Sequence, residues 1–121
     1  MPTLELLKNR KRTGYDEQNR KEKRKIYSSS RYRKIRALKI QNNPVCEICE
    51  LMNKTSADRI QVHHWKQFFN QLPDERDRLA HDYNNLVTLC HKCHEEIHSG
   101  YLRGCYSIDD VIKRLKELNK I

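Results

Sequence analysis

The chain has 121 residues, of which 36% are apolar, and carries a formal net charge of +9 and a mean hydropathy of -1.00. This composition predicts one small domain with a tail, because too few apolar residues are present to fill two cores. The longest apolar runs fall far short of the roughly 20 residues that a membrane span requires, and the first residues lack a signal-peptide core. We therefore expect an intracellular, cytoplasmic protein.

The positive charge is concentrated near the N-terminus. Residues 1–45 contain 14 basic and 4 acidic side chains, whereas the rest of the chain contains 11 and 12. Basic side chains that neutralise phosphates release condensed counterions, so this asymmetry favours a polyanionic partner. A solvated tail without a partner explains the charge alone equally well. Residues 1–27 hold few apolar side chains, and we expect a basic arm that is disordered or helical only when bound.

The first predicted helix begins at Ser30 and ends near Asn42, because a serine run is a typical start signal and Pro44 prevents continuation. Its apolar residues recur at helical spacing and predict a buried stripe. The stripe comprises Tyr32, Ile35 and Leu38, with Ala37 as a further candidate. The opposite face carries the basic residues Arg31, Arg33, Lys34, Arg36 and Lys39.

Two short strands and a helix are predicted further along. The polar and apolar alternation over 59–63 and the apolar run 86–89 are typical of short strands. Residues 90–99 follow as a short helix that Gly100 ends in the C′ position. The connection 65–84 is long for a loop without structure, so we expect it to be functional or partly folded.

The last predicted helix begins at Ser107, with Asp110 three residues further on, a spacing typical of a helix N-terminus. Its apolar residues recur at helical intervals and predict a buried stripe. The stripe comprises Ile108, Val111, Ile112, Leu115 and Leu118.

Four of the five cysteines form two Cys-x-x-Cys pairs, Cys46 with Cys49 and Cys90 with Cys93. Each pair falls at a predicted turn where two sulfurs can converge, so the four thiolates predict a tetrahedral structural zinc site. Zinc would also supply stability that so small a core lacks. Redox-active dithiols are the alternative, although they occur as a single pair in a βαβ setting. Cys105 has no near neighbour and is interpreted as a small buried apolar residue.

Four histidines accompany these turns. His94 and His98 lie four residues apart on the predicted helix, so both imidazoles occupy one face and can bind a second ion. His63 and His64 are neighbours in a strand and point to opposite faces. At most one of them joins that ion unless the strand has turned, and the other is left free for proton transfer. Each alone is more simply a surface or core residue; the four together favour a site.

Three segments in this order resemble the motif of HNH endonucleases, which have the ββα-metal fold. They are Val62-His63-His64-Trp65, the run from Asn84 to His94, and Ile97-His98. The segment from Tyr27 to Arg36 is similar to the lead-in helix of small phage-type members. The resemblance implies a small α+β fold with a ββα-metal core and a zinc knuckle. It divides the chain into a basic arm (1–27), a nuclease domain (28–104) and a C-terminal helix packed on it (105–121).

The same resemblance assigns roles to individual residues. It makes His64 the general base and Asn85 the residue that pins the loop and orients that base. His63 and His94 become ligands of the catalytic ion, and His98 corresponds to a further ligand in members with His-x-x-x-His. Many members have Asp at the position of His63. Asn84 competes with Asn85, which we favour because it directly precedes the strand.

Phosphodiester hydrolysis suits these groups, because a neutral imidazole can accept the proton of a water and a divalent ion can act as Lewis acid. The resemblance implies an endodeoxyribonuclease that nicks or cuts double-stranded DNA, with structural Zn²⁺ and one catalytic Mg²⁺, Mn²⁺, Ni²⁺ or Zn²⁺ ion. Similar small proteins are encoded beside phage packaging genes, which implies terminase subunits as partners. Arg31, Arg33, Lys34 and Arg36 are expected to contact DNA phosphates.

Two other functions fit part of the pattern. A zinc-ribbon protein that binds nucleic acid without cutting it explains the charge and the cysteines, but not the surplus histidines. An interaction protein whose acidic loop 74–77 binds a partner also leaves the histidines unexplained.

Overall fold

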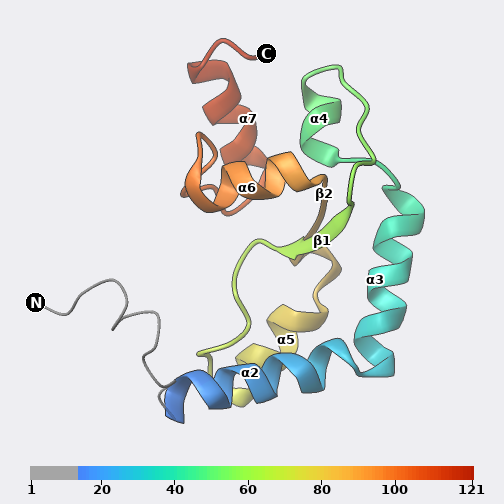
Figure 1. The fold of residues 1–121 in the computed structure, drawn as a ribbon, viewed down its shortest axis with the longest axis vertical. Helices are drawn as coiled ribbons and strands as arrows, with labels where there is room; N and C mark the ends of the chain where they lie inside the picture. Colours follow the sequence, from blue (N-terminus) through green and yellow to red (C-terminus); the bar gives the residue numbers. More distant parts are fainter. Residues whose placement is uncertain (1–13) are drawn as a thin grey trace, which may run out of the picture.

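The computed structural model describes residues 14–121 (Figure 1). Helices α2 (Gly14–Tyr27) and α3 (Ser30–Asn42) come first, followed by α4 (Glu47–Leu51) and strand β1 (Gln61–His64). Helix α5 (Pro73–His81) and the short 3₁₀ helix η1 (Tyr83–Asn85) lead into strand β2 (Leu86–Leu89). Helices α6 (His91–Ser99) and α7 (Ile108–Glu117) complete the chain. Among these described residues, no helix has the length and apolar character needed to cross a membrane.

The centre of the fold is a β-hairpin followed by a helix. Strands β1 and β2 pair antiparallel, with His63 opposite Val87 and His64 opposite Leu86. Helix α6 follows β2 directly and contacts both strands. The small α+β class and the zinc-knuckle core are confirmed. Strand β1 is displaced from the predicted 59–63, because Arg59 has a left-handed φ of 47° that extended backbone does not allow, and it extends to include His64.

The basic segment differs from its prediction over residues 14–27. Residues 14–27 form helix α2, which lies beside α5, at the end of the molecule away from α4 and α7 (Figure 1). Glu22 pairs with Arg76 of α5 at 3.0 Å, and Ile26 packs on a small apolar cluster of Phe68, Leu79 and Ala80. A few such contacts order a helix that its composition alone would leave unfolded. The predicted arm over residues 1–13 lies outside the described residues.

Helix α3 occupies its predicted range and buries Tyr32 as predicted, but the rest of its buried face differs. Leu38 is 46% exposed, and Ala37 also faces solvent, whereas Lys39, which the pattern placed on the charged face, is 6% exposed. The Lys39 ammonium group lies 3.3 Å from the Glu47 carboxylate of α4. Glu47 also accepts a hydrogen bond of 2.6 Å from the backbone N–H of Thr88 in β2. This ion pair therefore ties the helix, the zinc knuckle and the open edge of β2 together.

We expect the Lys39→Met variant to be less stable by about 3 kcal/mol, because the half-buried Glu47 carboxylate loses its ion-pair partner while its burial remains. Urea unfolding at neutral pH measures this difference. Lys34→Met, on the exposed side of the same helix, is the matched control and should change stability by less than about 0.5 kcal/mol. Equal stabilities of the two variants would show that the pair contributes nothing to the fold.

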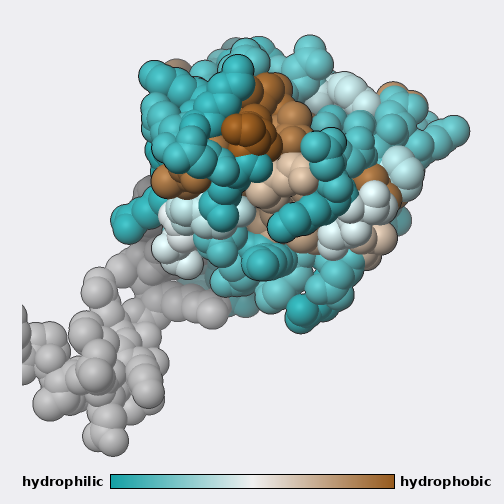
Figure 2. All heavy atoms as spheres, turned by 90° about the horizontal axis from the view of Figure 1, so that it is seen from above, coloured by the Kyte–Doolittle hydropathy of each residue, from teal (hydrophilic) through white to brown (hydrophobic). Residues whose placement is uncertain are grey.

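The main core surrounds the four cysteines. It contains Val87 and Leu89 of β2, together with Val111 and Leu115 of α7. Helix α7 is capped as predicted, because the Ser107 hydroxyl accepts a hydrogen bond from the N–H of Asp110. Leu118 of the predicted stripe is 44% exposed, since the helix has ended, whereas Cys105 is buried as expected. On the face seen from above, apolar surface forms a small area enclosed by hydrophilic side chains (Figure 2).

Candidate metal centre and active site

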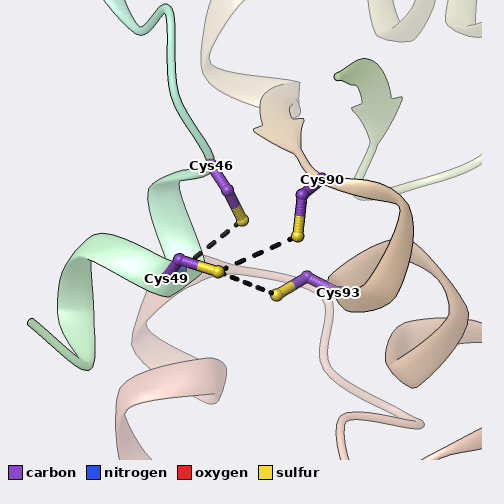
Figure 3. A group of neighbouring side chains, drawn as sticks. All are labelled: Cys46, Cys49, Cys90 and Cys93. Carbon is purple, nitrogen blue, oxygen red and sulfur yellow. Dashed lines mark hydrogen bonds between the residues drawn. The ribbon is translucent and has the colours of Figure 1, made fainter. Parts of the chain in front are cut away.

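The four predicted cysteines meet at one point. Their sulfur atoms all lie within 4.8 Å of one another, and all four side chains are buried (Figure 3). The Cys49 sulfur is 3.8 Å from that of Cys90 and 3.6 Å from that of Cys93. Tetrahedral zinc with Zn–S bonds of about 2.3 Å requires sulfurs about 3.8 Å apart. The donor set and its spacing therefore fit a structural zinc ion.

Local backbone structure places each cysteine pair. Cys46 caps the N-terminus of α4, where its sulfur accepts a hydrogen bond of 3.4 Å from the N–H of Cys49. Cys90 occupies the N-cap position of α6 without a side-chain cap hydrogen bond, and Cys93 lies in the first turn of that helix. Hydrogen bonding from Cys93 lowers the pKa of Cys46 to about 4, whereas burial raises the pKa of Cys49 to about 12. One thiolate is thus favoured already, and a bound dication would favour deprotonation of the others.

Helix α6 presents a second donor set. The Nε2 atoms of His94 and His98 lie 3.2 Å apart, which matches two imidazoles on one ion at Zn–N distances of about 2.0–2.1 Å. The His63 ring of β1 faces them, with its centroid 5.4 Å from that of His94 and 6.1 Å from that of His98. Burial, followed by the neighbouring imidazoles, lowers the pKa of His63 to about 4. Its neutral form is the one that binds metal.

His64 lies on the other face of β1. Its side chain is buried, stacks on the Tyr32 ring at 5.7 Å, and meets Phe68 edge-on at 4.8 Å. Its Nε2 atom is 3.0 Å from the carbonyl oxygen of Ala80. A carbonyl oxygen only accepts, so Nε2–H is the donor and Nδ1 keeps its lone pair. Burial lowers the pKa of His64, although the hydrogen bond to Ala80 acts in the opposite direction. The lowered pKa keeps the imidazole neutral.

Asn85 joins the segment after β1 to the end of α5. Its Oδ1 accepts from the N–H of Lys66 at 2.9 Å, and its Nδ2 donates to the carbonyl oxygens of Lys66 and Leu79, each at 3.0 Å. The backbone N–H of Trp65 also donates to the Asn85 carbonyl at 2.8 Å. By contrast, Asn84 is exposed, and its N–H bonds to the side chain of Asp82. The Asn85 side chain therefore fixes the backbone near His64, at Lys66, and the backbone next to Ala80, at Leu79, so it holds both partners of the hydrogen bond between His64 and Ala80 in place.

Two surface cavities, of about 550 Å³ and 280 Å³, open beside the histidines. His63, His64, Gln67 and His98 line both of them, so the cavities meet at the histidine cluster. The larger cavity extends to the turn 103–106, and the smaller one extends to α2. A strand of a polymeric substrate could therefore pass across the cluster.

The predicted phosphate-binding residues of α3 lie elsewhere. Arg33, Lys34 and Arg36 are exposed, and Arg31 pairs with Asp77 of α5 at 2.7 Å. None of the four lines either histidine cavity.

Sequence reasoning missed several residues around the cluster. Lys23 and Tyr27 of α2 line the smaller cavity, and Lys66, Arg103 and Tyr106 line the larger one. These residues belong to the predicted basic arm, to the connection 65–84 and to the segment between the last two predicted helices, and no spacing rule linked them to the histidines. The Ala80 carbonyl, as a backbone group in the long connection, has no sequence signature.

The fold and the site define a class. A β-hairpin and a helix carry clustered histidines beside a four-cysteine knuckle, which is the arrangement of a small metal-binding domain. Residues 46–100 match the model of the HNH endonuclease family. Members of this family are generally nucleases. No curated protein and no solved structure matches the chain.

Proposed function

We propose that this protein is a metal-dependent endonuclease that hydrolyses DNA phosphodiester bonds. The observation that carries the proposal is the position of the His63 ring beside the paired rings of His94 and His98, with His64 held separately on the other face of β1. The four cysteines already provide a complete ligand set for structural zinc, so the histidines remain for chemistry. The family match at residues 46–100 supports the same reaction class.

The second donor set suits one divalent ion. His63, His94 and His98 would hold Mg²⁺, Mn²⁺, Ni²⁺ or Zn²⁺, with imidazole ligands favouring the softer ions of this set. When bound, such an ion supplies Lewis-acid stabilisation for a phosphoryl oxygen and the leaving oxygen. The low pKa of His63 keeps its ring available as a ligand at neutral pH.

His64 is the proposed general base. The hydrogen bond from Nε2–H to Ala80 fixes the tautomer, so Nδ1 is the atom that takes the proton of the attacking water. Asn85 is the proposed positioning residue, because its three side-chain hydrogen bonds fix the backbone next to His64 and next to Ala80. General-base catalysis of this kind contributes roughly 10²- to 10⁴-fold to a rate.

The remaining assignments extend this proposal. Residues 28–104 would form the nuclease domain, and the packing of α7 on α4 supports treating 105–121 as a helix docked on it. The phosphates of double-stranded DNA would be contacted by the basic side chains of α3, namely Arg31, Arg33, Lys34 and Arg36. Arg31 would make this contact while also paired with Asp77. Assistance to a phage terminase during genome packaging stays a prediction from the resemblance.

A supercoiled-plasmid assay with the zinc-loaded protein tests the proposal. We expect conversion to nicked or linear DNA on addition of at least one of Mg²⁺, Mn²⁺, Ni²⁺ or Zn²⁺, and none after chelation. Measured zinc content in the same samples separates loss of the structural ion from loss of catalysis. DNA binding without cleavage under every metal would instead identify a zinc-containing binding module.

A further inference from the structure

The larger histidine cavity has a wall that lies outside the segment matching the family. Arg103, Gly104, Cys105 and Tyr106 line it together with His64 and His98. These residues follow the family match, which ends at residue 100. The turn therefore belongs to the same surface as the histidines without belonging to the motif.

This turn is held firmly by α7. The Arg114 guanidinium donates to the carbonyl oxygens of Tyr101 at 2.7 Å and Arg103 at 3.0 Å. The N–H of Tyr106 donates to the Asp110 carboxylate at 2.9 Å. Leu102 and Cys105 are buried at 0% and 4% exposure and anchor the backbone between them. The turn is thus a preorganised element rather than a loose connection.

The two outward side chains of the turn are free. Tyr106 is 61% exposed, and none of the aromatic contacts in the described chain involves its ring. Arg103 is exposed, and within residues 14–121 no carboxylate lies within ion-pair distance of it. The acidic side chain on this cavity, Glu75, is already paired with Arg78 at 3.2 Å. An anionic substrate therefore meets an unpaired cation and an uncovered aromatic face.

We propose that the turn 103–106 binds the DNA strand beside the cleaved phosphate, with Tyr106 stacking on an unpaired base and Arg103 contacting a phosphate. This inference rests on the proposed function and narrows its substrate to DNA that carries unpaired bases next to the cut. A base inside a duplex is covered on both faces by its neighbours, so only an unstacked base can lie on the Tyr106 ring. Arg103 supplies the charge that a phosphate requires.

The inference is tested by fluorescence anisotropy with the full-length zinc-loaded protein and a short single-stranded oligonucleotide, without added divalent metal. Tyr106→Ser should weaken binding about tenfold, whereas Tyr106→Phe retains the ring and should bind as the wild type does. Arg103→Gln should lower the magnitude of the salt slope by about 0.7, the value for one phosphate contact to a single strand. A fully paired duplex of the same sequence should lose less affinity through Tyr106→Ser.

Lys54→Gln, at an exposed lysine of the zinc knuckle that lines neither cavity, is the charge-matched control and should change neither quantity. Wild-type affinity in Tyr106→Ser, or an equal loss on the two DNAs, would overturn base stacking. An unchanged salt slope in Arg103→Gln would overturn the phosphate contact. If the wild type cleaves plasmid, these results for the variants reject the inference but not the proposed function. A wild type that neither binds nor cuts DNA rejects the proposed function.

Discussion

The His64→Ala variant is expected to lose cleavage by roughly 10²- to 10⁴-fold while retaining its zinc and its DNA affinity. His64 is the proposed general base, and its Nδ1 keeps a lone pair for the proton because Nε2–H is donated to the Ala80 carbonyl; alanine has no such group. None of the four cysteines is involved, so the structural ion should stay. Single-turnover plasmid nicking in the metal that supports wild-type activity, with zinc content and DNA anisotropy in parallel, measures all three properties.

Because His64 is buried against Tyr32 and Phe68, alanine also leaves a cavity, and a second variant is needed. His64→Gln keeps most of the side-chain volume and an N–H donor for the Ala80 carbonyl, but it has no nitrogen that accepts a proton. It should therefore be as inactive as His64→Ala and more stable than that variant. His91→Gln is the matched control, since that histidine of α6 lines neither cavity. Nicking by His64→Gln at the wild-type rate would remove His64 from the role of base.

Short-range patterns predicted much of this fold. The run 86–89, apolar except for Thr88, forms β2 with the expected bounds, and the two Cys-x-x-Cys pairs meet in one cluster. The alternation rule for a strand also separated the neighbouring histidines, because His63 faces α6 and His64 faces α3 and α5. The strand and the separation of the two histidines depend on interactions within a few residues. The cysteine pairs meet across 41 residues, from Cys49 to Cys90, and were predictable because four thiolates in two such pairs are a typical zinc ligand set.

Interactions between distant segments defeated the same reasoning. Lys39 counts as a surface residue by helical spacing, but Glu47 and the backbone of Thr88 make its burial favourable. Helix α2 is ordered by Arg76 and by an apolar cluster contributed from the connection 65–84. In the site, the Ala80 carbonyl and the turn 103–106 reach the histidines only through the packing of α5 and α7. No local pattern records such partners.

Removal of the structural zinc is expected to unfold the main core. Cys46, Cys49, Cys90 and Cys93 lie inside it, among side chains of β2 and α7, and their sulfurs join α4 to the start of α6. Structural zinc contributes on the order of 10 kcal/mol in small zinc peptides, which equals the whole stability of many domains. Loss of the ion also leaves four buried thiols without the Zn–S bonds that held them together.

Cys93→Ser should therefore bind less than one equivalent of zinc and show no cooperative thermal transition, as should the wild type treated with a strong chelator. Circular dichroism with metal analysis measures both. Cys105→Ser is the matched control, because this cysteine is equally buried but outside the cluster; it should keep its zinc and lose on the order of 1 kcal/mol. His98→Ala should also keep the structural ion while losing cleavage, which separates the two donor sets on α6. A cooperative transition in zinc-free Cys93→Ser at the wild-type temperature would mean that packing around β2 and α7 holds the knuckle without metal.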